Sequence, residues 1–353
     1  MEEILKRLPE RLLPWYEENR RELPWRRDRE PYHVWVSEIM LQQTRVEAVR
    51  GYYTRFLEAL PTVFDLARAE DDRLRKLWEG LGYYTRVRNL KKAAQVIVSQ
   101  YGGVFPRTYE EVLGLPGVGE YTAGAVCSIA FDLPTPAVDG NVLRVLARLL
   151  EDSAPVDLPE TKKQARLRLE KVYPQGACGA FTQALMELGA TVCLPGGEPR
   201  CGSCPVGELC RARASGRWRE LPCRTSKRPR RQEDRTVFLL SCEGRFALER
   251  RQEQGLLAGL WQFPNVPGAL EEGAALEQAA RWGLAPRELL CRWDRSHIFT
   301  HIRWDMRCYR VDCGSAAPSF TWLTLEEIRR EAALPTAFRQ FWDLAELVAP
   351  ERL

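Results

Sequence analysis

Several features that would assign a protein to a particular class are missing from this sequence. Apolar runs such as Ala123 to Phe131 stop far short of the roughly 20 residues that a helix needs to cross a membrane. The first residues, Met1 to Ile4, lack the basic region and the apolar stretch of a secretory signal peptide. Internal repeats and low-complexity tracts are also absent. We therefore expect a cytoplasmic protein without a membrane partner, in a compartment where thiols stay reduced.

A strong excess of charge is lacking as well. The 52 basic and 48 acidic residues leave a net charge of +4, which is too small to indicate a nucleic-acid-binding protein. The excess is local, because residues 224–235 hold six Lys or Arg, two acidic residues and no large apolar side chain. We interpret this segment as a basic linker between two nearly neutral parts.

The length of 353 residues predicts two domains, or three, of ordinary globular composition. Three- and four-residue apolar spacing up to about residue 215 predicts helices, and Thr108 and Glu111 have the spacing of a capping box. From Arg235 the pattern changes to strands at 237–240, 246–248 and 302–311, a turn at 243–244, and helices at 271–282 and 336–347. The predicted organisation is an all-α domain at 1–217, a linker at 218–234 and a smaller α/β domain at 235–353.

Eleven cysteines are many for a reducing compartment, and their odd number argues against a complete disulfide framework. Cys193, Cys201, Cys204 and Cys210 lie within 18 residues and can converge on one centre. Zinc sites more usually show two Cys-x-x-Cys pairs, whereas one pair with unequal outer spacings suits a cubane iron–sulfur cluster. We favour the cluster, while a zinc site and unrelated buried thiols remain as alternatives.

A glycine hairpin precedes the apolar helix 121–131. Gly117 and Gly119 let backbone amides point outward at a helix start, where an anion such as a DNA phosphate binds favourably. The short helix before them, from Glu110, completes a helix–hairpin–helix pattern. Twenty residues further on, Asp139 stands at the start of the next helix, where it can be an ordinary N-cap or a catalytic acid.

Glu38 lies in a helix, residues 34–44, that is apolar nearly all round. Burial should raise the pKa of its carboxyl group, which suits a general acid near neutral pH. A glutamate that reaches solvent or an arginine partner is the alternative. Gln42, Gln43 and Thr44 follow with amides and a hydroxyl that can bond base edges.

Together these motifs resemble the helix–hairpin–helix DNA glycosylases of the endonuclease III superfamily. Glu38 within the stretch 37–44 narrows the resemblance to the MutY-type adenine DNA glycosylases. The resemblance implies a monomer that flips adenine mispaired with 8-oxoguanine or guanine out of double-stranded DNA, and one [4Fe-4S] cluster on the four-cysteine loop 193–210. It also implies that the protein associates with the nucleoid.

The resemblance assigns roles to individual residues. Bifunctional relatives carry a lysine where this chain has Tyr121, so a monofunctional glycosylase is implied. Glu38 would protonate adenine at N7, and Asp139 would stabilise the oxocarbenium-like sugar, with Tyr121 and Asn141 in support. Further matches are the adenine-pocket residues Trp25, Arg26 and Gln183, and the residues at the DNA lesion, Gln43, Thr44 and Tyr83.

The second domain resembles the Nudix-related domain of the same family through residues 255–264. The helix at 276–283 lacks paired carboxylates, so this domain should read a base and not hydrolyse a nucleotide. The family reads 8-oxoguanine with a Phe-Ser-His loop, which matches Phe299, Thr300 and His301 here. Thr300 replaces the usual serine, and the first two cysteines are separated by seven residues instead of six.

Two other functions remain as alternatives. One is a bifunctional endonuclease III-like enzyme for oxidised pyrimidines, against which Tyr121 and the second domain argue. The other is a non-catalytic iron–sulfur DNA-binding protein, against which a buried Glu38 argues, because a protein that only binds DNA has no use for a buried acid.

Overall fold

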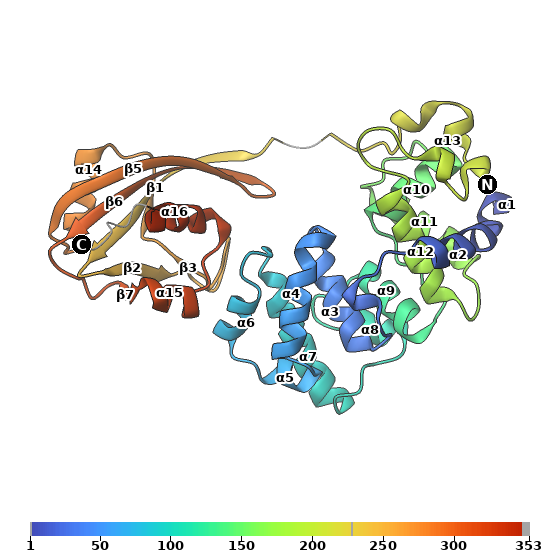
Figure 1. The fold of residues 1–353 in the computed structure, drawn as a ribbon, viewed down its shortest axis with the longest axis horizontal. Coiled ribbons are helices and arrows are strands. Elements are labelled where there is room, and N and C mark those ends of the chain that lie inside the picture. The colour runs from blue at the N-terminus through green and yellow to red at the C-terminus, as the bar shows by residue number, and fades with distance from the viewer. Residues whose placement is uncertain (1, 227–228, 348–353) are drawn as a thin grey trace. The chain divides into compact units, whose positions relative to one another are not determined.

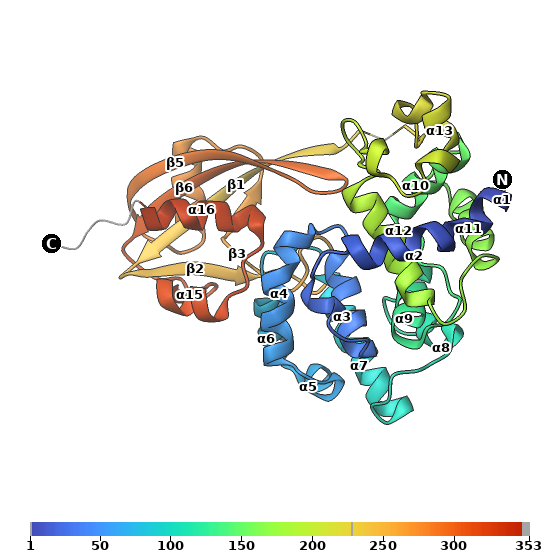
Figure 2. The same cartoon turned by 45° about the vertical axis from the view of Figure 1, so that its right-hand side comes forward.

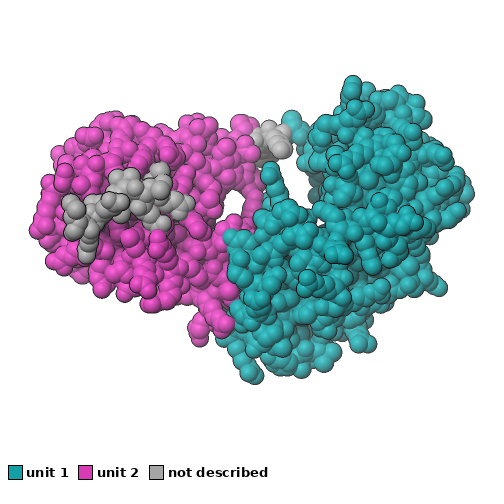
Figure 3. All heavy atoms as spheres, in the orientation of Figure 1, with its two compact units in different colours: residues 1–69, 88–226 teal, residues 70–87, 227–353 magenta. Residues whose placement is uncertain are grey.

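The computed structural model describes residues 2–226 and 229–347. It divides into two compact units, one formed by residues 1–69 and 88–226, the other by residues 70–87 and 227–353 (Figure 3). The short segment 70–87 thus belongs to the C-terminal unit, although helices of the other unit surround it in the sequence. Among the described residues, none of the helices combines the length and the apolar character that crossing a membrane requires.

The first unit is built of helices, as predicted (Figure 1). The capping box at Thr108 is present, with Glu111 closing it. The helices are α1 (Glu2–Lys6), α2 (Leu8–Asn19), η1 (Pro24–Arg26), α3 (Pro31–Leu41), α4 (Val46–Ala59), α5 (Val63–Arg68), α7 (Thr85–Tyr101), α8 (Tyr109–Leu113), α9 (Glu120–Phe131), α10 (Gly140–Leu150), α11 (Pro159–Glu170), α12 (Cys178–Thr191), η2 (Cys201–Ser203), η3 (Gly207–Leu209), α13 (Arg211–Ala214) and η4 (Arg217–Arg219).

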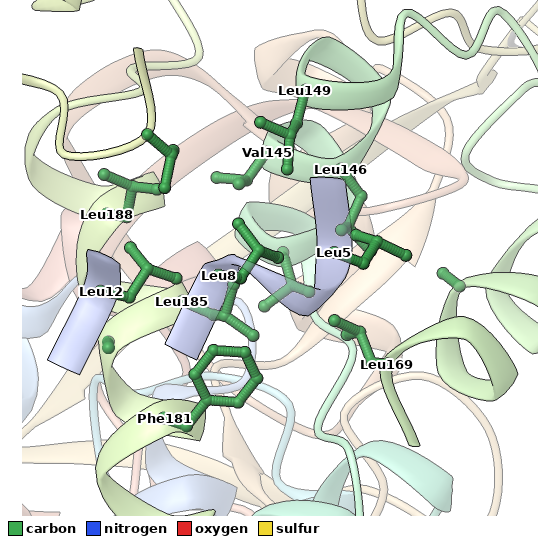
Figure 4. Close-up of a cluster of buried hydrophobic side chains, with 14 of the residues drawn as sticks. Leu5, Leu8, Leu12, Val145, Leu146, Leu149, Leu169, Phe181, Leu185 and Leu188 are labelled. Atoms are coloured by element: carbon green, nitrogen blue, oxygen red, sulfur yellow. The ribbon is translucent and has the colours of Figure 1, made fainter. Parts of the chain in front are cut away.

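A leucine-rich core fixes α10 and α12 against the N-terminal helices. Leucines of α1 and α2 pack on the apolar faces of α10, α11 and α12 (Figure 4). Each such side chain contributes about 1.5–3 kcal/mol when it is fully buried. Gly189 of α12 lies so close to the start of α10 that a Cβ atom there would stand 2.5 Å from Asn141 Cβ. This close approach sets the position of the first turn of α10.

The second unit is a twisted sheet with helices on both faces. Its strands among the described residues are β1 (Arg231–Cys242), β2 (Arg245–Arg250), β3 (Trp261–Gln262), β4 (Asn265–Pro267), β5 (Pro286–Ile298), β6 (Ile302–Cys313) and β7 (Thr321–Thr324). The order is β3-β2-β1-β6-β5, with β4 beside β1 and β7 beside β2, and only the β1–β6 pair is parallel among these pairings. The predicted strands at 237–240, 246–248 and 302–311 are therefore confirmed.

Two apolar layers cover this sheet. On one face, β1, β2 and β6 pack against α15 (Leu325–Glu331) and α16 (Thr336–Leu347). On the other face they pack against α14 (Glu272–Arg281), as the two views of Figures 1 and 2 show. The unit also contains α6 (Asp71–Leu77). The strand β1 begins at Arg231, inside the segment that the sequence predicts to be a linker.

Candidate active site

Glu38 is buried in α3, between helical neighbours that are themselves buried and apolar, such as Val34 and Trp35. Burial raises the pKa of its carboxyl group to about 7, and the nearby Asp139 adds to the shift. A hydrogen bond from Tyr121 and the charge of Arg26 act in the opposite direction. Glu38 can therefore carry a proton at neutral pH, as a general acid must.

Tyr121 of α9 donates its hydroxyl proton to Glu38 Oε2 over 2.5 Å. Burial raises the pKa of this phenol well above its usual value, and the charges of Glu38 and Asp139 act in the same direction. Tyr121 therefore remains a neutral donor, and it fixes one oxygen of the Glu38 carboxyl group. An amine that could form a Schiff base is not present at this position.

Asp139 is both an N-cap and a part of the site. Its Oδ1 accepts from the Val142 amide and its Oδ2 from Asn141 Nδ2, each over 2.8 Å. Burial raises the pKa of Asp139, and these hydrogen bonds oppose the shift. The helix cap therefore orients a carboxylate whose charge is felt by Glu38. The N-cap that the sequence allows is therefore present, and the catalytic role of Asp139 stays a prediction.

A cleft beside this pair is lined by Gln43, Tyr121 and Asp139, among others. Gln43 is in the left-handed region, with φ of 57°, although it is not glycine. The neighbouring Gln42 is held by a hydrogen bond of 3.2 Å to Thr122 Oγ1. Gln42 and Gln43 thus line the cleft, and Thr44 follows them directly in the sequence.

The glycine hairpin lies at the start of α9. Gly117 has a φ of 76°, and a Cβ atom there would stand 2.5 Å from Asn89 Cβ, so both the turn and the packing require glycine. Gly119 is the N-cap residue of α9, and it has no side chain to cap the helix. The first amides of α9 thus face outward without a side-chain acceptor, which is the geometry that anions use at helix starts.

The three residues that resemble an adenine pocket come from η1 and α12. Trp25 packs edge-on against Tyr53, with ring centroids 5.6 Å apart. Arg26 lies close enough to Glu38 for its charge to lower the pKa of that carboxyl group. Gln183 Oε1 accepts from the Tyr16 hydroxyl over 3.1 Å.

The four cysteines of the loop 193–210 line one cavity. The rest of its wall is mainly aliphatic, together with Arg148, Arg213 and Trp218. Within the described ranges, no three His, Cys, Asp or Glu side chains lie close enough to hold a single metal ion. A zinc ion would require sulfurs at about 2.3 Å from one point. The four thiols therefore surround one common space, and they are the residues of this loop that could hold a metal centre.

In the second unit, the loop after β5 presents two exposed polar residues, Thr300 and His301. Phe299 is turned inward and packs on Trp304 and His297, with ring centroids 4.9 and 4.6 Å away. The Tyr83 hydroxyl lies 3.3 Å from Thr300 Oγ1. The structure thus brings together two of the residues predicted to meet a lesion, and it gives Phe299 an anchoring position.

Comparisons with known proteins identify both parts of the chain. A family model described as HhH-GPD superfamily base excision DNA repair protein matches residues 36–175, and a NUDIX domain model matches residues 236–344. The adenine DNA glycosylase of Rattus norvegicus is 37% identical over 399 residues, which cover 95% of this chain and 77% of the rat protein. The human adenine DNA glycosylase is 37% identical over 395 residues, which cover 93% and 72%.

The chain belongs to the adenine DNA glycosylase family.

A solved structure, that of a thermostable thymine-DNA glycosylase, matches with a TM-score of 0.56 at 31% identity, covering 60% of this chain and 98% of the other. The predicted order of a helical helix–hairpin–helix domain and a Nudix-like domain is therefore confirmed for this member of the adenine DNA glycosylase family. The roles given to single residues stay predictions.

The structure of this adenine DNA glycosylase family member also adds residues that sequence reasoning missed. Arg144 Nη2 donates to Asn141 Oδ1 over 2.9 Å, and its Nε donates to the Cys193 carbonyl over 2.8 Å. Arg148, one turn further along α10, donates to Cys193 Sγ over 3.3 Å. These two buried arginines link Asp139, through Asn141, to the four-cysteine loop. The periodicity of α10 gives only a weak sign of them, as charged positions on an otherwise apolar face.

Glu187 is a second residue that the sequence did not single out. Its side chain is fully buried, and both oxygens accept charged hydrogen bonds from Arg21 and Arg26 at 2.7–2.9 Å. Arg26 also donates to the Arg21 carbonyl and lies over the Tyr16 ring. The guanidinium of Arg26 is therefore held on three sides. A glutamate inside an apolar helix was a possible signal, as it was for Glu38.

Proposed function

We propose that this protein excises adenine from duplex DNA in which the adenine is mispaired with 8-oxoguanine or, less efficiently, with guanine. The observation that carries the proposal is a pair of interacting carboxyl groups, Glu38 and Asp139, with Tyr121 bonded to the first and lining the same cleft as the second. Glu38 has a pKa of about 7 and Asp139 is oriented by a helix cap, so that one can be neutral while the other is ionised. The 37% identity to the rat and human adenine DNA glycosylases supports adenine as the excised base.

In this mechanism Glu38 transfers a proton to N7 of the flipped adenine. The bond between N9 and the sugar C1′ then breaks, and its electron pair leaves with the neutral base. The ionised Asp139 stabilises the positive charge that develops on the sugar. A water molecule adds to C1′ and loses a proton, which leaves an abasic site. The adenine has to leave the base stack first, because an acid in a buried helix cannot reach it inside the duplex.

The enzyme should not cut the strand itself. A strand-cleaving glycosylase attacks C1′ with an amine and forms a Schiff base. At the corresponding position this chain has Tyr121, whose hydroxyl is committed to Glu38. We therefore propose a monofunctional glycosylase and disfavour the endonuclease III-like alternative.

Cys193, Cys201, Cys204 and Cys210 would hold one [4Fe-4S] cluster, which supplies a rigid crosslink for a loop that has little secondary structure of its own. Chemical analysis would separate this proposal from a zinc site. About four irons and four acid-labile sulfides per chain are expected, and one zinc per chain without sulfide would contradict it.

The second unit would read the partner base. Thr300 and His301 at the exposed loop offer a hydroxyl and an imidazole that can bond to 8-oxoguanine, and Tyr83 beside them would enter the duplex. Double-stranded DNA is then the partner of a monomer acting in the cytoplasm.

One experiment tests this function. An end-labelled duplex with a single adenine opposite 8-oxoguanine is incubated with the protein and analysed with and without later alkali. Strand breaks only after alkali are expected. Breaks without alkali would identify a lyase, and no breaks in either sample would contradict the proposal. A duplex with adenine opposite thymine is the control, and one with an oxidised pyrimidine tests the endonuclease III-like alternative.

A further inference from the structure

The chain that leaves the four-cysteine region is tied back onto the first unit. The Val156 amide donates to the Cys223 carbonyl over 3.0 Å, and the Thr225 amide donates to Asp157 Oδ1 over 2.9 Å. The Thr225 hydroxyl also donates to Asp157 Oδ2. These bonds hold the pKa of Asp157 below its usual value, with the hydroxyl bond as the largest cause. The first residues of the basic segment are therefore fixed, and we call these three hydrogen bonds the Asp157 latch.

The latch places Arg224 in the wall of the cleft that contains Tyr121 and Asp139. Two cations of α11, Lys162 and Arg166, line the same cleft. Arg166 is paired with Glu170 on its own helix. Lys162 and Arg224 are exposed, and their side chains form neither a hydrogen bond nor an ion pair with any residue in 2–226 or 229–347.

The charge of the cleft explains what these two cations can do. The mechanism above requires an ionised Asp139, and the carboxylate of Glu120 also lines the cleft. A nucleotide entering the cleft brings phosphates on both sides of its sugar, and these carboxylates repel them. Unpaired cations on the wall of the same cleft offset that repulsion, and each can bind a phosphate oxygen.

We propose that Lys162 and Arg224 bind backbone phosphates of the strand that carries the excised base, and that Asp157 is the positioning residue for Arg224. The inference rests on the proposed function, because that function places the nucleotide in this cleft. It makes the start of the basic segment part of the glycosylase site.

The first test measures binding to a duplex that contains a tetrahydrofuran abasic analogue, as a function of salt. A plot of the logarithm of the binding constant against the logarithm of the salt concentration has a negative slope. Lys162→Ala and Arg224→Ala should each make this slope shallower by about one, and weaken binding by about five- to tenfold at 0.1 M salt. Lys163→Ala is the matched control, because Lys163 is an equally charged, exposed neighbour on α11 that does not line the cleft. Slopes that stay at the wild-type value in both cleft variants would overturn the proposal.

The second test uses the sign of a charge change. Asp157→Ala removes a negative charge from the cleft, so binding would become tighter if Asp157 were only an acidic wall residue. We expect weaker binding, close to that of Arg224→Ala, and no further loss in the double variant. Thr225→Ala keeps every charge and should weaken binding in the same direction, so it remains informative if Asp157→Ala folds poorly. Tighter binding of Asp157→Ala, or wild-type binding of Thr225→Ala, would remove the latch from the proposal.

These results are separable from the proposed function. The abasic analogue requires no excision, so the salt slopes can be measured even if the protein does not release adenine. Failure of the wild-type protein to release adenine would reject the proposed function and leave the slopes interpretable. Normal adenine release together with unchanged salt slopes would reject only the proposal that Lys162 and Arg224 bind phosphates.

Discussion

At the scale of single residues, Glu38 is held in a protonation state that its surroundings impose. Apolar neighbours in α3 make its charged form costly, while Tyr121 donates to one of its oxygens. The outcome is a pKa of about 7, near the pH at which a general acid is most useful. Burial raises the pKa of its partner Asp139, and the hydrogen bonds of a helix cap oppose that shift by favouring the ionised form.

Removing this acid should greatly slow the excision of adenine and leave the binding of DNA nearly unchanged. Glu38→Gln is expected to bind the mismatched duplex and to lose excision by roughly 10²–10⁴-fold or more, the usual span for a general acid. Single-turnover release of adenine measures the loss, and a gel-shift titration measures the binding. Turnover near the wild-type rate would show that Glu38 is not the acid.

The same substitution should also change stability, in a direction that depends on pH. The neutral form of Glu38 is favoured by the fold, so its stabilising effect is complete below about pH 4.5 and is lost as pH rises through about 7. Glu38→Gln has no such loss. As the pH rises from 5 to 8.5, the free energy of unfolding of the variant should therefore increase relative to that of the wild type by on the order of 3 kcal/mol. Thermal unfolding at both pH values measures this, and parallel behaviour of the two proteins would contradict it.

At the scale of an element, one face of α12 carries two polar side chains that contact other helices of the first unit. Gln183 and Glu187 are four residues apart, so they lie one above the other along the helix. Gln183 is oriented by Tyr16, and Glu187 binds Arg21 and Arg26. The helix thereby fixes Arg26, whose charge lowers the pKa of Glu38.

This arrangement predicts an unequal effect for two glutamate substitutions. Glu187→Gln should destabilise the protein by about 2–4 kcal/mol, because it leaves two partly buried guanidinium groups without their carboxylate. Glu277→Gln is the control, since the Glu277–Arg281 pair on α14 is 70% exposed on both sides and should contribute less than about 1 kcal/mol. Urea unfolding of both variants checks the difference, and equal values would contradict it.

Elements were predictable from the sequence where burial leaves a pattern. The apolar helix around Glu38, the capping box at Thr108 and the strand at 302–311 all follow from spacing. The strand β5, Pro286–Ile298, was not predicted, because it forms an edge of the sheet and most of its side chains are exposed. Contacts between distant residues, such as those of Arg144 and Glu187, leave no periodic signal, because tertiary packing decides them.

At the scale of the whole molecule, two units with separate cores carry different parts of one proposed reaction. The carboxyl pair belongs to the first unit, while Thr300, His301 and Tyr83 belong to the second. This division predicts that base excision and choice of the partner base can be separated by mutation.

A double variant tests this separation. Replacing Thr300 and His301 by Ala should reduce the preference for adenine opposite 8-oxoguanine over adenine opposite guanine, because both side chains are exposed and lie far in sequence from the acids. Each lost base contact should cost about 1–3 kcal/mol of discrimination. Excision rates on the two duplexes give the ratio, and an equal loss on both would indicate general damage to the protein. Glu288→Ala, at an exposed position of β5, serves as the matched control.

The strand β1 begins at Arg231, whose amide donates to the His301 carbonyl over 3.0 Å. Residues 231–234 pair with residues 302–305 of β6, directly beside the loop that holds Thr300. A recombinant fragment that starts at residue 235, where the apolar strand pattern begins, would lack the residues that pair with 302–305 of β6. The unpaired backbone groups of β6 could then bind a strand of another chain, and the loop that holds Thr300 would lose the neighbouring strand that supports it. A C-terminal fragment intended for crystallisation or binding studies should therefore start no later than residue 229.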